Sequence, residues 1–145
     1  MARGDVVVFD EAKAKMLDGD WASTDHFYCA ICDNTATPAA ATATPVIGDF
    51  TQVGAGGTYV NNGTDLGTLA ALVAEVDGTM TFDSATNPPW AQNAGNDVDA
   101  YWGIIYNFTD AGKDALAFVD LGGPVDMSAG DLTITWNVAG IFTIA

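Results

Sequence analysis

The sequence predicts an all-β protein: an antiparallel β-sandwich, jelly-roll-like, with one short N-terminal helix. Short apolar segments separated by Gly-, Asp- and Pro-rich turns recur along the chain, as in sandwiches and barrels. Charged residues make up 16% of the chain, against roughly 25% in a typical globular protein, and nearly all acidic residues are Asp, which favours turns. We expect a single domain overall, with residues 1–45 forming a strand, a helix and an extended arm that contacts neighbours, and residues 46–145 forming the sandwich.

The N-terminal part is expected to contain two strands and the helix. Residues 6–9 form a short apolar run that reads as a strand. Asp10 is expected to cap a helix over residues 11–19, which ends at a glycine. Residues 26–32 follow as a strand, and the Thr/Ala/Pro-rich residues 33–45 read as an extended arm over a surface. We expect that deleting residues 1–18 spares the fold.

The middle of the chain reads as short strands divided by turns. Residues 46–67 suggest two short strands separated by glycines. Residues 68–82 fit helical spacing in part, but Asp77-Gly78 between two apolar segments favours a hairpin, which we predict. Residues 87–99 form a polar connection, in which Pro88-Pro89 exclude a central strand.

The last third contains the most apolar strands. Residues 100–108 form a long apolar run, which suits a strand covered on both faces. Residues 115–121 are the next strand, and "GDLTITWNVAGIFTIA" (130–145) is the terminal one. Trp102 and Trp136 lie in these runs and are assigned to the core. The final segment is expected to pair within its own sheet or against a neighbouring subunit.

The net charge of −15 restricts the partners of the protein. It repels nucleic-acid phosphates and anionic membranes, so we expect neither nucleic acid nor membrane as a partner. No apolar run approaches the roughly 20 residues of a membrane span, and the first residues do not resemble a signal peptide. The chain is therefore expected to be synthesised and to fold in a cytoplasm.

The two cysteines have the CxxC spacing of redox and zinc sites. Cys29 and Cys32 lie in a predicted strand, however, where residues three apart point to opposite faces. Zinc would need two more ligands, and His26 is the only histidine. We therefore predict two buried, reduced thiols.

No arrangement of residues predicts catalysis. His26 has three serines as possible nucleophiles, none of them in a GxSxG turn, and the chain has only two glutamates. The oxygen-rich Asn93–Asp99 stretch is explained by turn chemistry, with a structural calcium ion as the alternative. We expect no catalytic residue, no cofactor and no bound metal, and hence no enzyme.

Three of the four cations lie within the first 15 residues. Arg3, Lys13 and Lys15 are expected to dock on acidic patches of a partner or of another copy of the chain, the alternative being a solvated surface of little energetic weight. Trp90 follows two prolines in a polar segment and is expected to be a contact residue, because Trp is enriched at interfaces.

Four segments in a fixed order resemble a known family. They are "GDFTQVGAGGTYVNNGTDLG", "LVAEVDGTMTFDSATNPPWA", "AYWGIIYNFTDAGKDALAFVDLGG" and "AGDLTITWNVAGIFTIA", which together cover residues 46–145. Their sequence is similar to that of small head decoration (cement) proteins of tailed bacteriophages. The resemblance implies a β-sandwich, commonly jelly-roll-like and often trimeric, on the outer capsid surface of the virion. Residues 1–45 depart from the part that matches.

The function that follows is capsid decoration without catalysis, with the major capsid protein and the chain itself, as a homotrimer, as partners. An alternative is a fibre-tip or carbohydrate-binding sandwich that contacts a host glycan through Trp90 and nearby Asp and Asn residues. A sandwich hydrolase is a third. The residues expected at capsid or subunit contacts are Arg3, Val6, Phe9, Lys13, Lys15 and Trp90.

Overall fold

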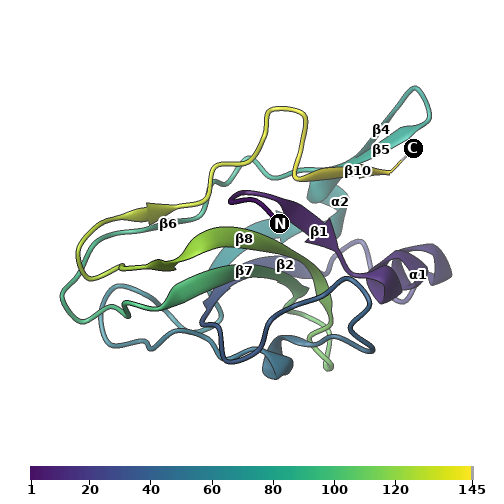
Figure 1. The fold of residues 1–145 in the computed structure, drawn as a ribbon. Coiled ribbons are helices and arrows are strands. Elements are labelled where there is room, and N and C mark those ends of the chain that lie inside the picture. The colour runs from purple at the N-terminus through teal and green to yellow at the C-terminus, as the bar shows by residue number, and fades with distance from the viewer. Residues whose placement is uncertain (145) are drawn as a thin grey trace.

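A five-stranded antiparallel sheet forms the centre of the molecule in the computed structural model, which describes residues 1–144 (Figure 1). The strand order is β1-β8-β7-β2-β3, so strands from both ends of the chain lie side by side. The all-β class with antiparallel sheets is confirmed. The five strands are β1 (Val6–Val8), β2 (His26–Cys32), β3 (Thr64–Thr68), β7 (Ala100–Asn107) and β8 (Ala115–Val125).

The two longest strands of this sheet arise from the apolar runs of the last third. Almost every residue of β7 is buried, as expected for a strand covered on both faces. Gly103 pairs with Val119 of β8, and a Cβ atom placed on Gly103 would lie 2.6 Å from the Val119 side chain and 3.0 Å from that of Ile134. The absence of a side chain at Gly103 therefore lets the layer containing Ile134 approach the sheet closely.

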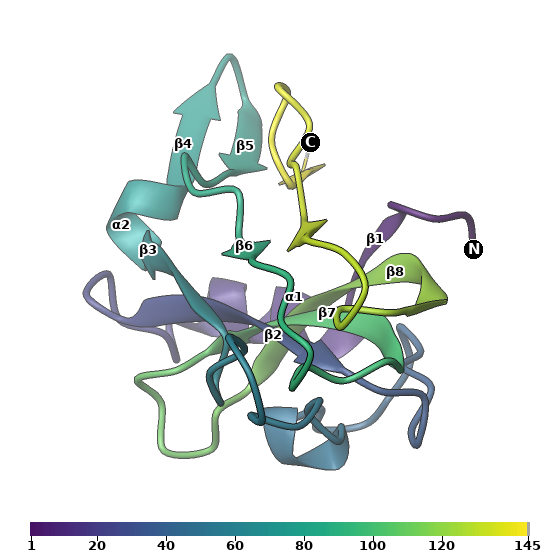
Figure 2. The same cartoon turned by 90° about the vertical axis from the view of Figure 1, so that its left-hand side faces the viewer.

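Two small sheets cover one face of the central sheet (Figure 2). One has the order β10-β5-β4 and the other pairs β6 with β9, all antiparallel. Phe82 joins the layers, because its ring lies 5.7 Å from that of Phe27 in β2, in an edge-to-face arrangement. The five strands are β4 (Val73–Val76), β5 (Thr79–Phe82), β6 (Pro89–Trp90), β9 (Leu132–Thr133) and β10 (Phe142–Ile144).

Residues 33–63 lie on the opposite side of the central sheet and include the 3₁₀ turn η1 (Ile47–Asp49). Phe50 from this segment stacks on Phe9, whose ring is 5.1 Å from that of Phe118 in β8. The Tyr59 hydroxyl accepts a hydrogen bond from the backbone N–H of Ile31 in β2 (3.1 Å). The predicted extended arm, residues 33–45, is likewise held to its own molecule, because Pro45 accepts a hydrogen bond from the backbone N–H of Ala115 (2.8 Å) and Ala40 accepts one from that of Asp10 (2.9 Å).

The helix α1 (Asp10–Asp18) follows β1 directly. The prediction that Asp10 caps it is wrong: Phe9 is the N-cap residue and makes no side-chain cap bond, while Asp10 is the first helical residue. Gly19 ends the helix as predicted, in the left-handed conformation (φ 76°) that glycine adopts without strain. A second, single-turn helix, α2 (Leu69–Leu72), precedes β4.

The Asp77-Gly78 hairpin is confirmed. Both residues have positive φ (51° and 80°), as a type I′ turn between β4 and β5 requires. The helical spacing noted in residues 68–82 corresponds to a helix only over the four residues of α2. The terminal segment is not one strand: its first part forms β9 and its last part β10, in different sheets, and residue 145 lies outside the described residues.

The N-terminal 45 residues are not separate from the rest of the fold. β1 pairs with β8, and β2 lies between β7 and β3. The expected boundary at residue 45 therefore does not coincide with any division of the structure, because strands from both sides of it share one sheet.

Candidate contact surface

The predicted contact residues are dispersed in the structure. Arg3 and Val6 lie at β1, an edge strand of the central sheet, where Arg3 is exposed and Val6 half-buried. The aliphatic part of Arg3 packs beside Gly122 of β8, where a Cβ would lie within about 3 Å of it. Arg3 forms no ion pair with any residue that the structure describes. Arg3 is therefore available for a partner with a carboxylate.

Phe9 and Trp90 are not surface residues, which corrects the assignment of both as contacts. Phe9 is fully buried between Phe118 and Phe50. Trp90 is 5% exposed, and its ring lies 6.2 Å from that of Tyr59. The polar residues beside Trp90 in the sequence predicted an exposed position. In the structure Trp90 belongs to the two-residue strand β6, in which Pro89 is exposed and Trp90 is buried.

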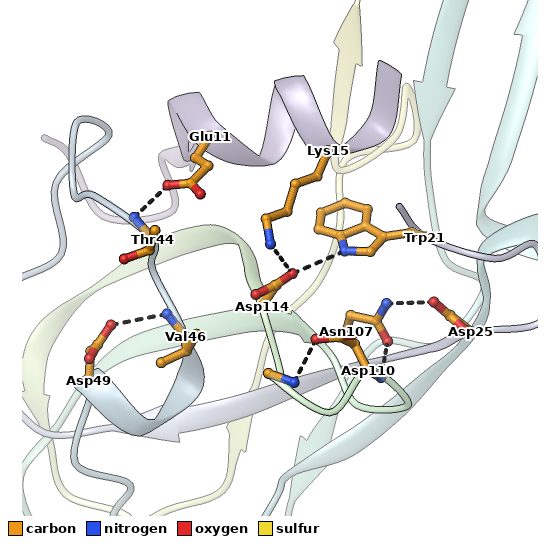
Figure 3. Close-up of polar contacts among 11 residues, drawn as sticks. Glu11, Lys15, Trp21, Asp25, Thr44, Val46, Asp49, Asn107, Asp110 and Asp114 are labelled. Atoms are coloured by element: carbon orange, nitrogen blue, oxygen red, sulfur yellow. Dashed lines mark hydrogen bonds and ion pairs between the residues drawn. The ribbon is translucent and has the colours of Figure 1, made fainter. Parts of the chain in front are cut away.

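Lys15 is half-buried and paired within the chain, so it is not a docking residue. Its ammonium group pairs with the carboxylate of Asp114, which also accepts a long hydrogen bond (3.5 Å) from the indole N–H of Trp21 (Figure 3). The hydrogen bond to Asp114 raises the pKa of Lys15 above its ordinary value. The pair links α1 to the turn between β7 and β8.

Further hydrogen bonds fix the surroundings of α1 (Figure 3). The Glu11 carboxylate accepts a bond from the backbone N–H of Thr44 (2.5 Å), which ties the segment 33–45 to the helix. The Asn107 amide donates to the carboxylate of Asp25 (2.7 Å) at the end of β7. The N-terminal region is therefore an ordered part of the body, and of its two lysines only Lys13, paired with Asp10 at an exposed site, faces solvent.

An apolar groove lies between α1 and the base of the β4–β5 hairpin, and we call it the α1 groove. It has a volume of about 780 Å³. Leu17, at its edge, is 87% exposed, which is unusual for a large apolar side chain. Its lining includes Lys13, Met16, Leu17, Val73, Met80 and Ile144.

A second hollow, of about 470 Å³, lies where the two layers open beside β1. Val119, Ile134 and Trp136 form part of its apolar lining, and Arg3 and Asp120 also line it. It is an opening between the edge strand β1 and the C-terminal segment. Its rim contains carboxylates as well as Arg3, so its charge does not select one kind of ligand.

The Asn93–Asp99 stretch uses its oxygens to build turns. Asn93 accepts a bond from the backbone N–H of Gly95 (2.9 Å), and Asp97 accepts bonds from those of Val98 (2.7 Å) and Gly54 (3.2 Å). Among the residues that the structure describes, no group of three or more His, Cys, Asp or Glu side chains could hold a metal ion.

Cys29 and Cys32 are free thiols and both are buried, as predicted. They lie on opposite faces of β2, and both faces are covered. Burial raises the pKa of both thiols, that of Cys32 to about 12. Since the thiolate is the reactive form, neither cysteine has the character of a redox centre.

His26 lies at the start of β2 and faces Asp65 of β3, with 2.9 Å between its Nδ1 and a carboxylate oxygen. Ser84, which could have served as a nucleophile, is buried and donates its hydroxyl to the carbonyl of Leu66 (2.9 Å). These groups serve the packing of strands and turns. Within the described residues, no helix has the length and apolar character to cross a membrane.

A comparison of the chain with protein-family models, with curated proteins and with solved structures finds no match in any of the three.

Proposed function

We propose that the chain is a capsid decoration protein of a tailed bacteriophage. It binds the shell of the major capsid protein on the outer surface of the virion, stabilises that shell without catalysis, and associates with itself as a homotrimer. The observation that carries the proposal is the ordered resemblance over residues 46–145. Those residues supply eight of the ten strands, including both small sheets of the second layer.

The use of polar side chains supports a structural role. Asp97 and Asn107 accept backbone N–H groups of residues one and two positions further along the chain, and Asn96 accepts that of Thr58 in another loop. The Tyr59 hydroxyl bonds to a central strand. Such bonds fix loops in one conformation, since each satisfies a backbone donor that folding would otherwise leave unpaired. A protein that reinforces a shell needs fixed loops, because a mobile contact surface loses binding free energy on ordering.

The contact surface of the proposal is smaller than the sequence suggested. Arg3, Val6 and Lys13 stay in it because their side chains reach the surface. Phe9, Lys15 and Trp90 leave it, since they are buried or paired within the chain. The finer description of the fold, a sandwich of the jelly-roll kind, is also part of the proposal.

The structure removes the residue on which the glycan-binding alternative depended. That alternative relied on Trp90 as an exposed stacking platform, but all four tryptophans are buried in the core. Sugar recognition by stacking needs an accessible aromatic face, which the buried Trp90 does not offer.

Purified virions of the phage whose genome encodes the chain provide the test. Quantitative mass spectrometry should find the chain in a copy number comparable to that of the major capsid protein, and added chain should rebind to stripped, expanded capsids. Absence from virions would contradict the proposal. So would a few copies per particle, the number typical of a tail or fibre component.

A further inference from the structure

The α1 groove is unusual for its charge as well as for its apolar lining. The chain has 19 acidic residues and four basic ones. Yet among the described residues that line the groove none carries a carboxylate, and Lys13 is its one charged side chain. The partner of Lys13, Asp10, lies outside the lining, and both side chains of this pair are exposed, so the pair contributes little energy and the ammonium group stays accessible. An occupant that suits it is apolar and carries a carboxylate, because that charge would meet Lys13.

The tip of the β4–β5 hairpin has that chemistry. Val76 is 65% exposed, and the exposed Asp77 follows it in the turn. The hairpin projects beyond the rest of the molecule in both views (Figures 1 and 2). The Glu75 carboxylate already accepts a hydrogen bond from the backbone N–H of Gly78 (2.6 Å) within the same turn. Asp77 is therefore the carboxylate of the tip that can pair with a cation of another molecule.

We propose that the hairpin tip of one copy of the chain inserts into the α1 groove of the next copy, with Val76 against the apolar lining and Asp77 beside Lys13. The occupant of the groove is thus a second copy of this chain. The contact rests on the self-association within the proposed function and not on capsid binding.

The charges favour this head-to-tail contact over a two-fold one. If two α1 grooves faced each other, the only charged side chains among their described lining residues would be two copies of Lys13, so neither lining would offer a carboxylate to the lysine of the other. In the head-to-tail arrangement a carboxylate meets the lysine instead. Each copy has one tip and one groove, and such a heterologous contact leaves both ends unfilled unless the copies close into a ring.

The first test compares two exposed valines. Val76→Glu places a second carboxylate at the tip, whereas Val138→Glu makes the same change at a fully exposed position of another loop. Analytical ultracentrifugation should show the wild-type chain and Val138→Glu as the same oligomer. Val76→Glu should weaken the association by roughly tenfold or more, because it buries a charge against apolar side chains. Circular dichroism checks that each variant is folded.

The groove side is tested independently. Leu17→Glu changes a side chain that contributes little to the fold, since it is almost fully exposed, and it should weaken association as Val76→Glu does. Lys13→Glu should also weaken it by opposing Asp77. Adding Asp77→Asn, which suits the positive φ of the turn, should recover part of the loss.

Two outcomes overturn the inference: a wild-type chain that is monomeric at all concentrations, or a Val76→Glu chain that associates as the wild type does. The failure of the proposed function would look different. A monomeric chain that still binds capsids leaves that function standing, while an oligomer held by the tip and the groove but absent from virions removes the function and leaves the contact.

Discussion

Asn96 shows how one side chain can hold two loops of this protein together. It is 6% exposed, and its amide oxygen accepts bonds from the backbone N–H groups of Thr58 (2.8 Å) and Tyr59 (3.2 Å). Its amide nitrogen donates to the carbonyls of Ala91 (3.0 Å) and Met127 (3.2 Å). A hydrophobic or truncated side chain at this position would leave the N–H groups of Thr58 and Tyr59 without an acceptor, whereas the carbonyls of Ala91 and Met127 keep a second donor each.

Replacing Asn96 by alanine should therefore lower the free energy of unfolding by about 1–3 kcal/mol, since the backbone N–H groups of Thr58 and Tyr59 lose their acceptor together. The control is Asn93→Ala in the same loop, which removes an exposed side chain bonded to Gly95 and should cost about 1 kcal/mol or less. Urea unfolding of both variants measures the difference. Equal small losses would mean that water replaces the amide at both positions.

Buried thiol and phenol groups make the stability of the fold sensitive to alkaline pH. Burial raises the pKa of Cys29, Cys32, Tyr59 and Tyr106 above their ordinary values, which are 9.0 for the thiols and 10.0 for the phenols. Between the unfolded and the folded pKa, the native state binds more protons than the unfolded state does. Stability is therefore complete below the unfolded pKa and falls as the pH rises above it.

We expect the free energy of unfolding to be constant near pH 8 and to fall above about pH 9, by up to about 1.4 kcal/mol per pH unit for each thiol. Urea unfolding between pH 7 and about pH 10.5 measures the slope. A variant with Cys29→Ala and Cys32→Ala should lose stability less steeply, because only the tyrosines then titrate. An unchanged slope would show that the thiols are not the cause.

At the level of the elements, the N-terminal strand and helix belong to the core structure. β1 pairs with β8 through Val6, Val7 and Val8. Phe9 and Ala12 are buried, and Lys15 is paired with Asp114. The sequence suggested a detachable arm because the segment is short and contains three of the four cations, but its strand pairs with the central sheet and its apolar side chains pack against the core.

Deletion of residues 1–18 should consequently unfold the protein or lower its melting temperature strongly, in contrast to what the sequence alone predicted. The loss of Phe9 accounts for a large part, and Phe9→Ala by itself should cost about 3–5 kcal/mol. The matched control is Lys13→Ala, an exposed change in the same segment that should cost less than about 0.5 kcal/mol. A deleted chain that melts like the full chain would contradict the structure of β1 and α1.

The elements that sequence reasoning found are those with strong local preferences. Asp77-Gly78 specifies its turn through positive φ, and the run 100–107 has the length and the continuous apolar character of a strand covered on both faces. Trp90 and the split of the terminal segment into β9 and β10 depend on partners far along the chain. No local pattern encodes such pairings, since a two-residue strand is too short for any periodicity.

The contact surface was even less predictable. Charge pointed to Lys13 and Lys15 alike, but only the structure shows that Asp114 binds one and leaves the other at the surface. The α1 groove could not be anticipated, because it brings together α1, the hairpin and β10, which are distant in sequence.

On the scale of the whole molecule, an excess of negative charge opposes the compact state. The net charge is −15, and the positions of the cations relieve little of it: Lys13 and Lys15 each neutralise one aspartate, and Lys113 lies over the ring of Phe108, 3.8 Å from its centroid. The remaining carboxylates repel one another more in the folded chain, where they are closer together than in the unfolded one. Their repulsion reaches across a small domain when the ionic strength is low, because the Debye length is then about 30 Å at 0.01 M.

Adding salt should therefore stabilise this fold. Between about 10 mM and about 150 mM NaCl the Debye length falls to about 8 Å, and we expect the melting temperature at pH 7.5 to rise by roughly 2–5 °C, the shift that about 1 kcal/mol produces at this size. Repeating the series near the isoelectric point, about pH 4.1, provides the control, since the net charge and the salt effect should both vanish there. If the melting temperature falls with salt at pH 7.5, attraction within pairs such as Lys15–Asp114 outweighs the general repulsion. The acidic surface would then destabilise the fold less than the net charge implies.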